Sequence, residues 1–295
     1  MHPWQNLSKC VISMPTYTYE ESVQWMRNQL EHSALVKLCY LDADNLEAAK
    51  RFALSDEFIC IKKLLNLNAQ SKQLRILDLG CGSGIASYAF ASLGHAVTAT
   101  DPDISGDVGL EATQRLSIAI QNGSIATVQA FAEALPFKNA TFDIVYARQA
   151  LHHFSDLYQG LAECSRVLKP NGLFLATREH VISDEKQLQE FLNNHILHRL
   201  HGGENAHTLD EYVAALRQAN LRKVKVLKAF DTIINHFPTS NLDIRNRLLQ
   251  SLTNRFGKKA ALVLSKFPFI EQVYRHRLSQ TCNTPGRLYS FICYK

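Results

Sequence analysis

A glycine-rich turn directly after a short apolar segment is the feature that most constrains how this chain of 295 residues folds. The apolar segment covers residues 75–79, and the turn reads Gly80-Cys-Gly-Ser-Gly84. Glycines at such a turn permit a tight bend and let a ligand approach the backbone closely. Residues 85–93 have a helical pattern, and the free N–H groups at the start of a helix attract an anion. The pattern predicts a strand, a ligand-binding turn and a helix in succession.

Apolar strands and helices continue to alternate after this unit. Such alternation indicates a parallel sheet with right-handed crossovers and with helices on both faces. We therefore predict an α/β fold, with a Rossmann-like, doubly wound and mainly parallel sheet of seven strands. Ligands of such sheets bind beyond the carboxyl ends of the strands. The strands expected after the first cover residues 96–100, 126–129, 142–147, 173–177, 223–227 and 287–294.

Helical segments flank the predicted sheet. We expect residues 1–71 to form a helical N-terminal cap, in which one helix covers residues 46–67. The cap precedes a domain of residues 72–295 that carries helical insertions at about residues 181–207 and 240–281. Because these insertions follow strands of the sheet, they are expected to enclose the site.

Two segments have the sequence of a capping box, in which a threonine at the N-cap is followed three residues later by glutamate. They are Thr18-Tyr-Glu-Glu21 and Thr208-Leu-Asp-Glu211. Each predicts the start of a helix. Pro268 is expected to interrupt the helices of the second insertion, because proline ends a helix that precedes it.

The composition is that of a globular protein, with 46% hydrophobic and 20% charged residues. The sequence has no run of about 18 uncharged apolar residues, so no membrane span is expected. Its start lacks the charged-then-apolar pattern of a signal peptide. Seven cysteines without a Cys-x-x-Cys pair predict reduced thiols. Together these features predict a cytoplasmic protein.

Basic residues are concentrated near the end of the chain. The net charge is +5, but ten Lys and Arg residues between positions 240 and 295 are opposed only by Asp243 and Glu271. A solvated helix face is the simplest explanation of this bias. The alternative is a surface for an anionic substrate, a nucleic acid or a lipid headgroup.

The glycine turn and the acid before it, Asp78-Leu-Gly-Cys-Gly-Ser-Gly84, resemble the first motif of class I S-adenosylmethionine-dependent methyltransferases. A dinucleotide fingerprint would need a third glycine at the position of Ile85. The resemblance continues in order to about residue 178, through segments typical of the quinone-pathway and small-molecule branch, type 11. These are Asp101 after the second strand, residues 133–137 with 142–145, residues 148–154 and residues 166–172.

The resemblance implies that the cofactor is S-adenosyl-L-methionine. Asp101 matches the family's acid that binds the ribose hydroxyls, and its two oxygens suit a cis-diol. The sequence departs from the family at Phe131, where the family usually has an acid that binds the adenine amino group. Adenine recognition is then left to packing by Phe131, to the backbone near Ala132 or to Glu133. The expected cofactor-binding residues are Asp78, Gly80, Cys81, Gly82, Gly84, Asp101, Pro102, Ala132, Glu133 and Arg148.

The expected reaction is an in-line displacement at the methyl carbon of the cofactor. In such a reaction the protein chiefly brings the acceptor close and excludes water. A general base helps when the acceptor is a hydroxyl or an acidic carbon. His152 and His153 follow the fourth strand, so either is a candidate base. Their alternative role is to hold the loop through hydrogen bonds.

The segment after the fifth strand is rich in histidine, with five of the twelve histidines of the chain between His180 and His207. We expect this insertion to roof a polar acceptor pocket. A metal site at His195, His198 and His201 is an alternative, but their spacing matches no zinc pattern, so no metal is predicted. The expected pocket residues are Glu179, His180, His198, His201 and Glu204.

We therefore predict an enzyme that methylates a small or medium-sized acceptor. Oxygen is the first choice of accepting atom, and carbon and nitrogen are alternatives. The basic segment suggests an anionic acceptor, whereas the absence of a recognisable RNA-binding module argues against a nucleic-acid partner. Three other functions stay open: a methyltransferase of RNA or of an anionic lipid, a non-catalytic S-adenosylmethionine-binding regulator, and an oxidoreductase.

Overall fold

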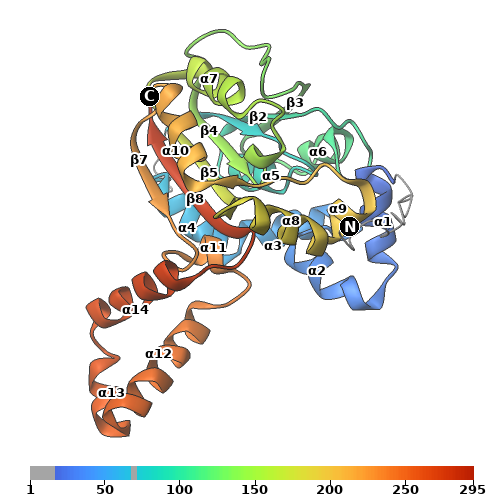
Figure 1. Ribbon diagram of the computed structural model, residues 1–295. Coiled ribbons are helices and arrows are strands. Elements are labelled where there is room, and N and C mark those ends of the chain that lie inside the picture. The colour runs from blue at the N-terminus through green and yellow to red at the C-terminus, as the bar shows by residue number, and fades with distance from the viewer. Residues whose placement is uncertain (1–16, 68–71) are drawn as a thin grey trace, which may run out of the picture.

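The computed structural model describes residues 17–67 and 72–295, which form one sheet covered by helices and a projecting helical lobe (Figure 1). Residues 1–16 and 68–71 of the predicted cap lie outside the described residues. Among the described residues, no helix combines the length and the apolar character needed to cross a bilayer. The strands are β1 (Arg75–Leu79), β2 (Ala96–Asp101), β3 (Ser124–Gln129), β4 (Phe142–Arg148), β5 (Leu168–Ile182), β6 (His207–Thr208), β7 (Arg222–Leu227) and β8 (Arg287–Tyr294).

The strands follow the order β3-β2-β1-β4-β5-β8-β7, and the short β6 pairs with the end of β5. Strands β1 to β5 are parallel, whereas β8 is antiparallel to both of its neighbours. The predicted α/β fold and mainly parallel sheet are confirmed. The prediction of seven strands omitted β6, because two residues are too short to give an alternating pattern.

Helices cover both faces of the sheet because the central strands are buried on both sides. In β1, Leu77 and Leu79 belong to one hydrophobic cluster and Ile76 belongs to the other. The first cluster includes α7 (Leu157–Val167) and α10 (Leu209–Gln218). The second cluster includes the helix after the glycine turn, α5 (Ile85–Ser92), with the end of α6 (Leu110–Ser117).

The N-terminal cap consists of short helices. They are α1 (Tyr19–Arg27), the 3₁₀ turn η1 (Leu30–His32), α2 (Ser33–Leu38), α3 (Asn45–Ala53) and α4 (Asp56–Leu64). The capping box at Thr18 is confirmed, because its hydroxyl accepts from Glu21 N–H at 3.2 Å and Glu21 Oε2 accepts from Thr18 N–H at 2.7 Å. The prediction of one helix at residues 46–67 is wrong. Ser55 interrupts it, because its hydroxyl accepts from Phe58 N–H and begins α4.

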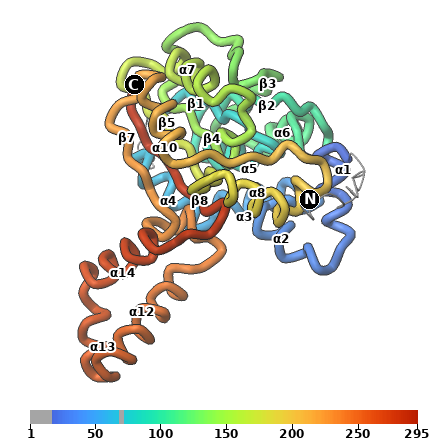
Figure 2. Tube along the Cα trace, viewed as in Figure 1, coloured from blue at the N-terminus to red at the C-terminus, as the bar shows by residue number. Residues whose placement is uncertain are grey.

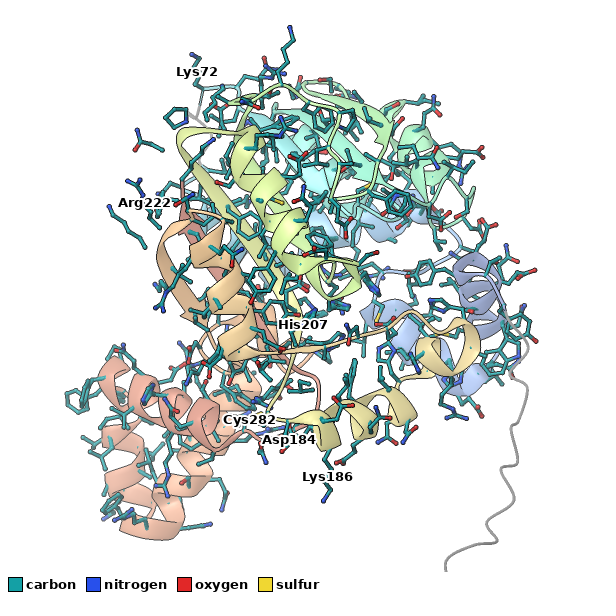
Figure 3. All side chains as sticks on the ribbon, turned by 45° about the horizontal axis from the view of Figure 1, so that its top comes forward. Lys72, Asp184, Lys186, His207, Arg222 and Cys282 are labelled. Carbon is teal, nitrogen blue, oxygen red and sulfur yellow. The ribbon has the colours of Figure 1, made fainter. Side chains whose placement is uncertain are left out.

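Two groups of helices follow β5. The first contains α8 (Glu185–Asn194) and α9 (Ile196–His201), which lead through Gly202 and Gly203 to β6. Figure 3 shows Asp184 at the start of α8 near Cys282. Hydrogen bonds from Ser183 and Gln187 to Asn283 hold this contact.

The second group, after β7, contains α11 (Ile233–His236), α12 (Asn241–Phe256), α13 (Lys258–Leu264) and α14 (Pro268–Thr281). We call residues 241–281 the helical lobe. Pro268 begins α14, where a proline fits the first turn. The lobe projects away from the sheet in both ribbon and tube views, so it does not cover the ends of β1, β2 and β4 (Figures 1 and 2).

Candidate active site

The sequence-predicted residues meet at the carboxyl edge of the central strands. The glycine turn follows β1, Asp101 ends β2, and the 3₁₀ turn η2 (Leu151–His153) follows β4. The strand order reverses between β1 and β4, and this point of a doubly wound sheet is where ligands bind. The fold therefore brings three distant segments to one crevice.

The glycine turn needs its glycines for two reasons. Gly80, Gly82 and Gly84 all have positive φ, of 65°, 52° and 79°. A Cβ on Gly80 would lie 2.7 Å from the Cβ of Ala150, and one on Gly84 would lie 2.5 Å from Thr113 Oγ1. Real Cβ atoms do not come so close, so side chains at these two positions would push the turn away from its neighbours.

Asp101 is tied to the glycine turn by hydrogen bonds. Its Oδ2 accepts from the N–H of Gly82 at 2.8 Å, and its Oδ1 accepts from the N–H of Asp103 at 2.9 Å. Each carboxylate oxygen has two acceptor positions, so both oxygens keep one for a ligand. Burial raises the pKa of Asp101 to about 6. The acid is thus fixed in orientation before a ligand arrives.

Asp78, at the start of the motif, faces inward. Its Oδ2 accepts from the hydroxyl of Ser87 in α5 at 2.6 Å, and only 1% of the residue is exposed. Burial raises the pKa of Asp78 to about 6. Cys81 is also buried, with its Sγ 3.7 Å from Thr113 Oγ1. Both side chains hold the turn against the helices behind it.

Arg148, predicted to bind the cofactor, is paired with Glu57 of α4. Its Nε donates to Glu57 Oε1 at 2.9 Å and its Nη2 to Glu57 Oε2 at 3.3 Å. Its guanidinium also lies over the rings of Tyr40 and Phe52, at 5.6 and 5.5 Å from their centroids. The pair therefore joins the N-terminal cap to the end of β4. Glu57 was not singled out by the sequence, because its position in α4 is that of an ordinary helix acid.

The segment after β3 lines another side of the crevice. Ala132 is buried, and Glu133 Oε1 accepts from the N–H of Asp156 at 3.1 Å, next to the start of α7. Phe131 is 64% exposed, so its ring is free to contact a ligand. Pro102, on the neighbouring segment after β2, receives a hydrogen bond at its carbonyl from Gln129 Nε2 at 2.9 Å.

Histidines and two carboxylates gather beside η2. Glu179 of β5 is fully buried and accepts from the N–H groups of Ala150 and His152 and from His152 Nδ1, the last at 2.8 Å. Burial lowers the pKa of His152, but the carboxylates of Glu179 and Glu204 outweigh this effect and raise it to about 9. Glu179 thus orients both the η2 backbone and one imidazole.

Glu204 lies at the centre of this group. Its Oε2 is 3.6 Å from His152 Nε2 and 3.9 Å from His153 Nε2, and its Oε1 is 3.7 Å from His195 Nδ1. His180 stacks edge-on to His152 and His195, with ring centroids 4.8 and 5.7 Å away. The side chain of His153 is 42% exposed, so the group opens on that side.

His198 and His201 lie farther along α9 and do not join the groups around Glu204. The ring of His201 contacts Tyr19 of α1, with 5.3 Å between the ring centroids. Burial, with the charges of Cys39, Glu204 and Asp101 nearby, raises the pKa of Tyr19. Tyr19 therefore packs against His201 of the insertion. The sequence did not predict this position of Tyr19, because the capping box at Thr18 predicts where the helix begins and not which residues it packs against.

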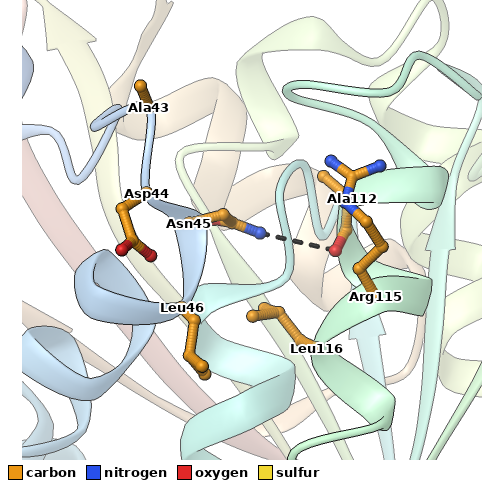
Figure 4. A pocket seen from close by; sticks show the side chains of 7 residues that line it. All are labelled: Ala43, Asp44, Asn45, Leu46, Ala112, Arg115 and Leu116. Carbon is orange, nitrogen blue, oxygen red and sulfur yellow. Dashed lines mark hydrogen bonds between the residues drawn. The ribbon is translucent and has the colours of Figure 1, made fainter.

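Helix α1 is held over the segment between β2 and α6. Arg27 Nη1 donates to Asp107 Oδ2 at 2.6 Å, and Asp107 N–H donates to Glu20 Oε1 at 2.6 Å. The cap thus encloses the crevice on the side of Asp101. A separate hollow of about 470 Å³ lies between α3 and α6. Figure 4 shows its lining residues and the hydrogen bond from Asn45 Nδ2 to the Ala112 carbonyl, and the same nitrogen also donates to the Ser83 carbonyl. This hollow lies behind the glycine turn, and neither Asp101 nor the histidines line it.

Comparisons with known proteins agree with this geometry. Residues 77–176 match a family profile described as a methyltransferase domain. An uncharacterized methyltransferase of Bacillus subtilis, YcgJ, is 35% identical over 127 residues, which is 41% of this chain and 46% of that protein. The 27-O-demethylrifamycin SV methyltransferase of Amycolatopsis mediterranei is 31% identical over 50% of this chain and 53% of its own length. The chain thus spans about half the length of these relatives.

A solved structure shares the fold over most of the chain. It is phosphoethanolamine N-methyltransferase 2 of Haemonchus contortus in complex with S-adenosyl-L-methionine, with a TM-score of 0.53 at 16% identity. The alignment covers 95% of this chain and 60% of that one. At this identity the likeness concerns the fold, whereas the profile match covers the glycine turn, Asp101 and η2. Residues 77–176 therefore resemble a methyltransferase domain in sequence, and most of the chain shares the fold of a structure solved with S-adenosyl-L-methionine.

Proposed function

We propose that this chain transfers the methyl group of S-adenosyl-L-methionine to a small or medium-sized acceptor, with an oxygen atom as the first choice. The observation that carries the proposal is the hydrogen bond between Asp101 and the Gly82 N–H, which joins two cofactor motifs of the family at one crevice. The relative from Amycolatopsis is named as a methyltransferase of 27-O-demethylrifamycin SV, a substrate whose name denotes a missing O-methyl group, and this supports oxygen as the accepting atom.

The cofactor supplies a methyl group already activated by the positive sulfur. The chain's residues would bind and orient it: the backbone of Gly80 to Gly84 would hold it closely, and the Asp101 oxygens would accept from the ribose hydroxyls. Ala132 and Glu133 bound the adenine side, where exposed Phe131 offers a ring for packing. Asp78, Cys81 and Arg148 act indirectly, because their polar groups are engaged with Ser87, Thr113 and Glu57.

The acceptor is assigned to the space between α1, η2 and the α8–α9 insertion. Tyr19, His153 and Glu204 supply polar groups there, and His201 lies against Tyr19. Enclosure by the cap and the insertion excludes water, which is the main help that a methyl transfer needs. His152 and His153 remain the candidates for handling the proton of an acceptor hydroxyl.

Calorimetry with the full chain tests the proposal. Folded protein should bind S-adenosylmethionine and S-adenosylhomocysteine with one site each. When it is incubated with S-adenosylmethionine and a panel of hydroxylated small molecules, the protein should produce S-adenosylhomocysteine with at least one of them. Uptake of neither nucleoside by folded protein would rule the function out. Uptake without turnover across oxygen, nitrogen and carbon acceptors would favour a non-catalytic regulator instead.

The helical lobe supports a second candidate, a methyltransferase whose acceptor lies at an anionic lipid surface. Its exposed side chains include Phe256, Phe267 and Phe269 beside Lys258 and Lys259. Apolar and basic groups together are the composition of surfaces that bind anionic membranes. Sedimentation should then show binding to phosphatidylglycerol vesicles but not to phosphatidylcholine vesicles. Salt at about 0.5 M should weaken this binding, because it screens charges more strongly than about 0.1 M salt, at which the Debye length is roughly 10 Å. Equal binding to both, or none, would remove this candidate.

A further inference from the structure

The imidazoles beside η2 are arranged as metal ligands usually are. Nδ1 of His152 donates to Glu179 at 2.8 Å, Nδ1 of His153 to the Gly203 carbonyl at 3.2 Å, and Nδ1 of His180 to the Gly286 carbonyl at 2.9 Å. In its neutral form, a histidine with its Nδ1 proton held in this way keeps a lone pair on Nε2. At His152, where the carboxylates of Glu179 and Glu204 favour the protonated ring, a metal ion would displace the Nε2 proton. Metal-binding histidines almost always have such a second partner, which fixes the tautomer and the ring orientation.

The free ring nitrogens are directed at Glu204 without bonding to it. Its oxygens lie 3.6 Å from His152 Nε2, 3.9 Å from His153 Nε2 and 3.7 Å from His195 Nδ1. These distances are too long for hydrogen bonds. They are close to the spacing of about 2.8–3.8 Å between neighbouring ligands of one five-coordinate ion with bonds of about 2.0–2.2 Å.

Two overlapping trios share this carboxylate. His152, His153 and Glu204 form one, and His180, His195 and Glu204 form the other, with the ligand atoms of each trio within 4.8 Å of one another. Nδ1 of His195 is buried and has no hydrogen-bond partner in the structure. A buried polar atom without a partner is costly, and a shared cation would remove that cost.

The charges of the group also suit a divalent cation. Glu179 and Glu204 are two buried carboxylates, and they lie on opposite sides of the His152 ring. With neutral imidazoles, one divalent ion would balance both. Nitrogen-rich sites with a single carboxylate ligand favour zinc and the neighbouring transition metals over magnesium or calcium.

We infer that Glu204 and the histidines around it, His152, His153, His180 and His195, bind one divalent transition-metal ion at the edge of the acceptor space. The ion would join η2 and β5 to the turn after α9, and its exposed side at His153 would receive an acceptor oxygen. Only the part given to the acceptor oxygen rests on the proposed function. Metal binding itself does not depend on methyl transfer.

Untagged full-length protein, stripped with a chelator and confirmed as folded by circular dichroism, should bind one Zn²⁺ per chain in calorimetry. Cobalt as a spectroscopic probe should give the visible absorption of a five-coordinate site. Glu204→Gln and, separately, His195→Ala should weaken Zn²⁺ binding at least about 10-fold. His198→Ala is the matched control from the same insertion, outside both trios, and should bind as the wild type does.

No stoichiometric Zn²⁺ uptake by the folded wild type would overturn the inference, as would equal affinity in wild type, Glu204→Gln and His195→Ala. His195→Ala keeps the test decisive if Glu204→Gln fails to fold, because His195 is partly exposed. Binding of S-adenosylhomocysteine by the stripped protein is measured alongside. If it persists while Zn²⁺ does not bind, the metal site fails alone; if Zn²⁺ binds and the nucleoside does not, the methyltransferase proposal fails alone.

Discussion

At the scale of single residues, Asp101 connects the two halves of the crevice. One oxygen holds the Gly82 N–H and the other holds the Asp103 N–H, so the acid sets the position of the turn as well as its own. A ligand that binds to the remaining acceptor positions finds them already oriented. Such preorganisation lowers the entropy that binding costs.

We expect Asp101→Ala to weaken S-adenosylmethionine binding by about 10- to 100-fold, because a charged hydrogen-bond partner contributes about 1.5–3 kcal/mol. The fold should remain, since the residue lies at a strand end. Calorimetry gives the affinity, and Glu111→Gln on the exposed side of α6 is the control. Unchanged affinity in folded Asp101→Ala protein would remove the ribose assignment.

The buried carboxylate of Asp78 should lower the free energy of unfolding at a pH where it is ionised. Burial raises its pKa from 3.8 to about 6, and it faces Ser87 of α5 with the charges of Asp101 and Arg148 nearby. Below about pH 4 both states are protonated, and above about pH 6 the folded state must hold a buried charge. Stability from this group is therefore lost as pH rises from about 4 to about 6.

Asp78→Asn should remove this dependence, because an amide oxygen still accepts from Ser87 and carries no charge. Urea unfolding at pH 8 should show the variant more stable than the wild type by up to about 3 kcal/mol. This is the free energy that corresponds to raising the pKa of Asp78 from 3.8 to about 6. The difference should shrink at pH 4.5. A difference of the same size at both pH values would mean that Asp78 is not the group responsible.

At the scale of elements, the buried pair of Glu57 and Arg148 joins α4 of the cap to β4 of the sheet. Arg178 adds a second buried cation, with its Nη1 donating to the carbonyl of Ile234 at 2.9 Å and lying 4.0 Å from Glu57. Two cations depend on one carboxylate. The position of the cap over the crevice therefore depends strongly on Glu57.

Glu57→Gln should destabilise the protein by about 3–5 kcal/mol, because it leaves buried Arg148 without a counter-ion. The double variant Glu57→Gln with Arg148→Met should recover part of the loss, since it removes the uncompensated charge as well. Chemical denaturation of the four proteins of this cycle measures the coupling. Additive losses would show that the two side chains do not act as a pair.

At the scale of the whole molecule, the lobe and the sheet are separate packing units. Helices α12 and α13 pack mainly on each other and on α14, and Figures 1 and 2 show them away from the crevice. The lobe is tied to the body through α14, where Ser279 donates to Asp231 and accepts from Phe230 N–H and Arg275 donates to the Phe230 carbonyl.

Replacing the tip of the lobe, residues 253–266, with a short Gly-Ser loop should therefore leave S-adenosylhomocysteine affinity within about twofold, since distant independent sites act additively. The apparent melting temperature should change little, because the sheet and its two hydrophobic clusters stay intact. Calorimetry and a thermal melt check both expectations. A large loss of affinity would place the lobe over the cofactor in solution.

Features of this protein that depend on short segments could be predicted from the residues alone. The turn at Gly80 to Gly84, the strand and helix alternation and both capping boxes depend on neighbouring residues, so their patterns could be read directly. The position of Asp101 beside the turn followed from the rule that parallel strands end at one edge.

Contacts between groups that are distant in the chain became visible in the folded structure. Nothing in the sequence pairs Glu57 with Arg148 or brings Tyr19 against His201. Nor does it separate His195 from His198 and His201, although these three share a helical spacing. Each of these contacts depends on how the cap and the insertion fold back on the sheet. Packing across the sheet sets that geometry, and local backbone preferences carry no information about it.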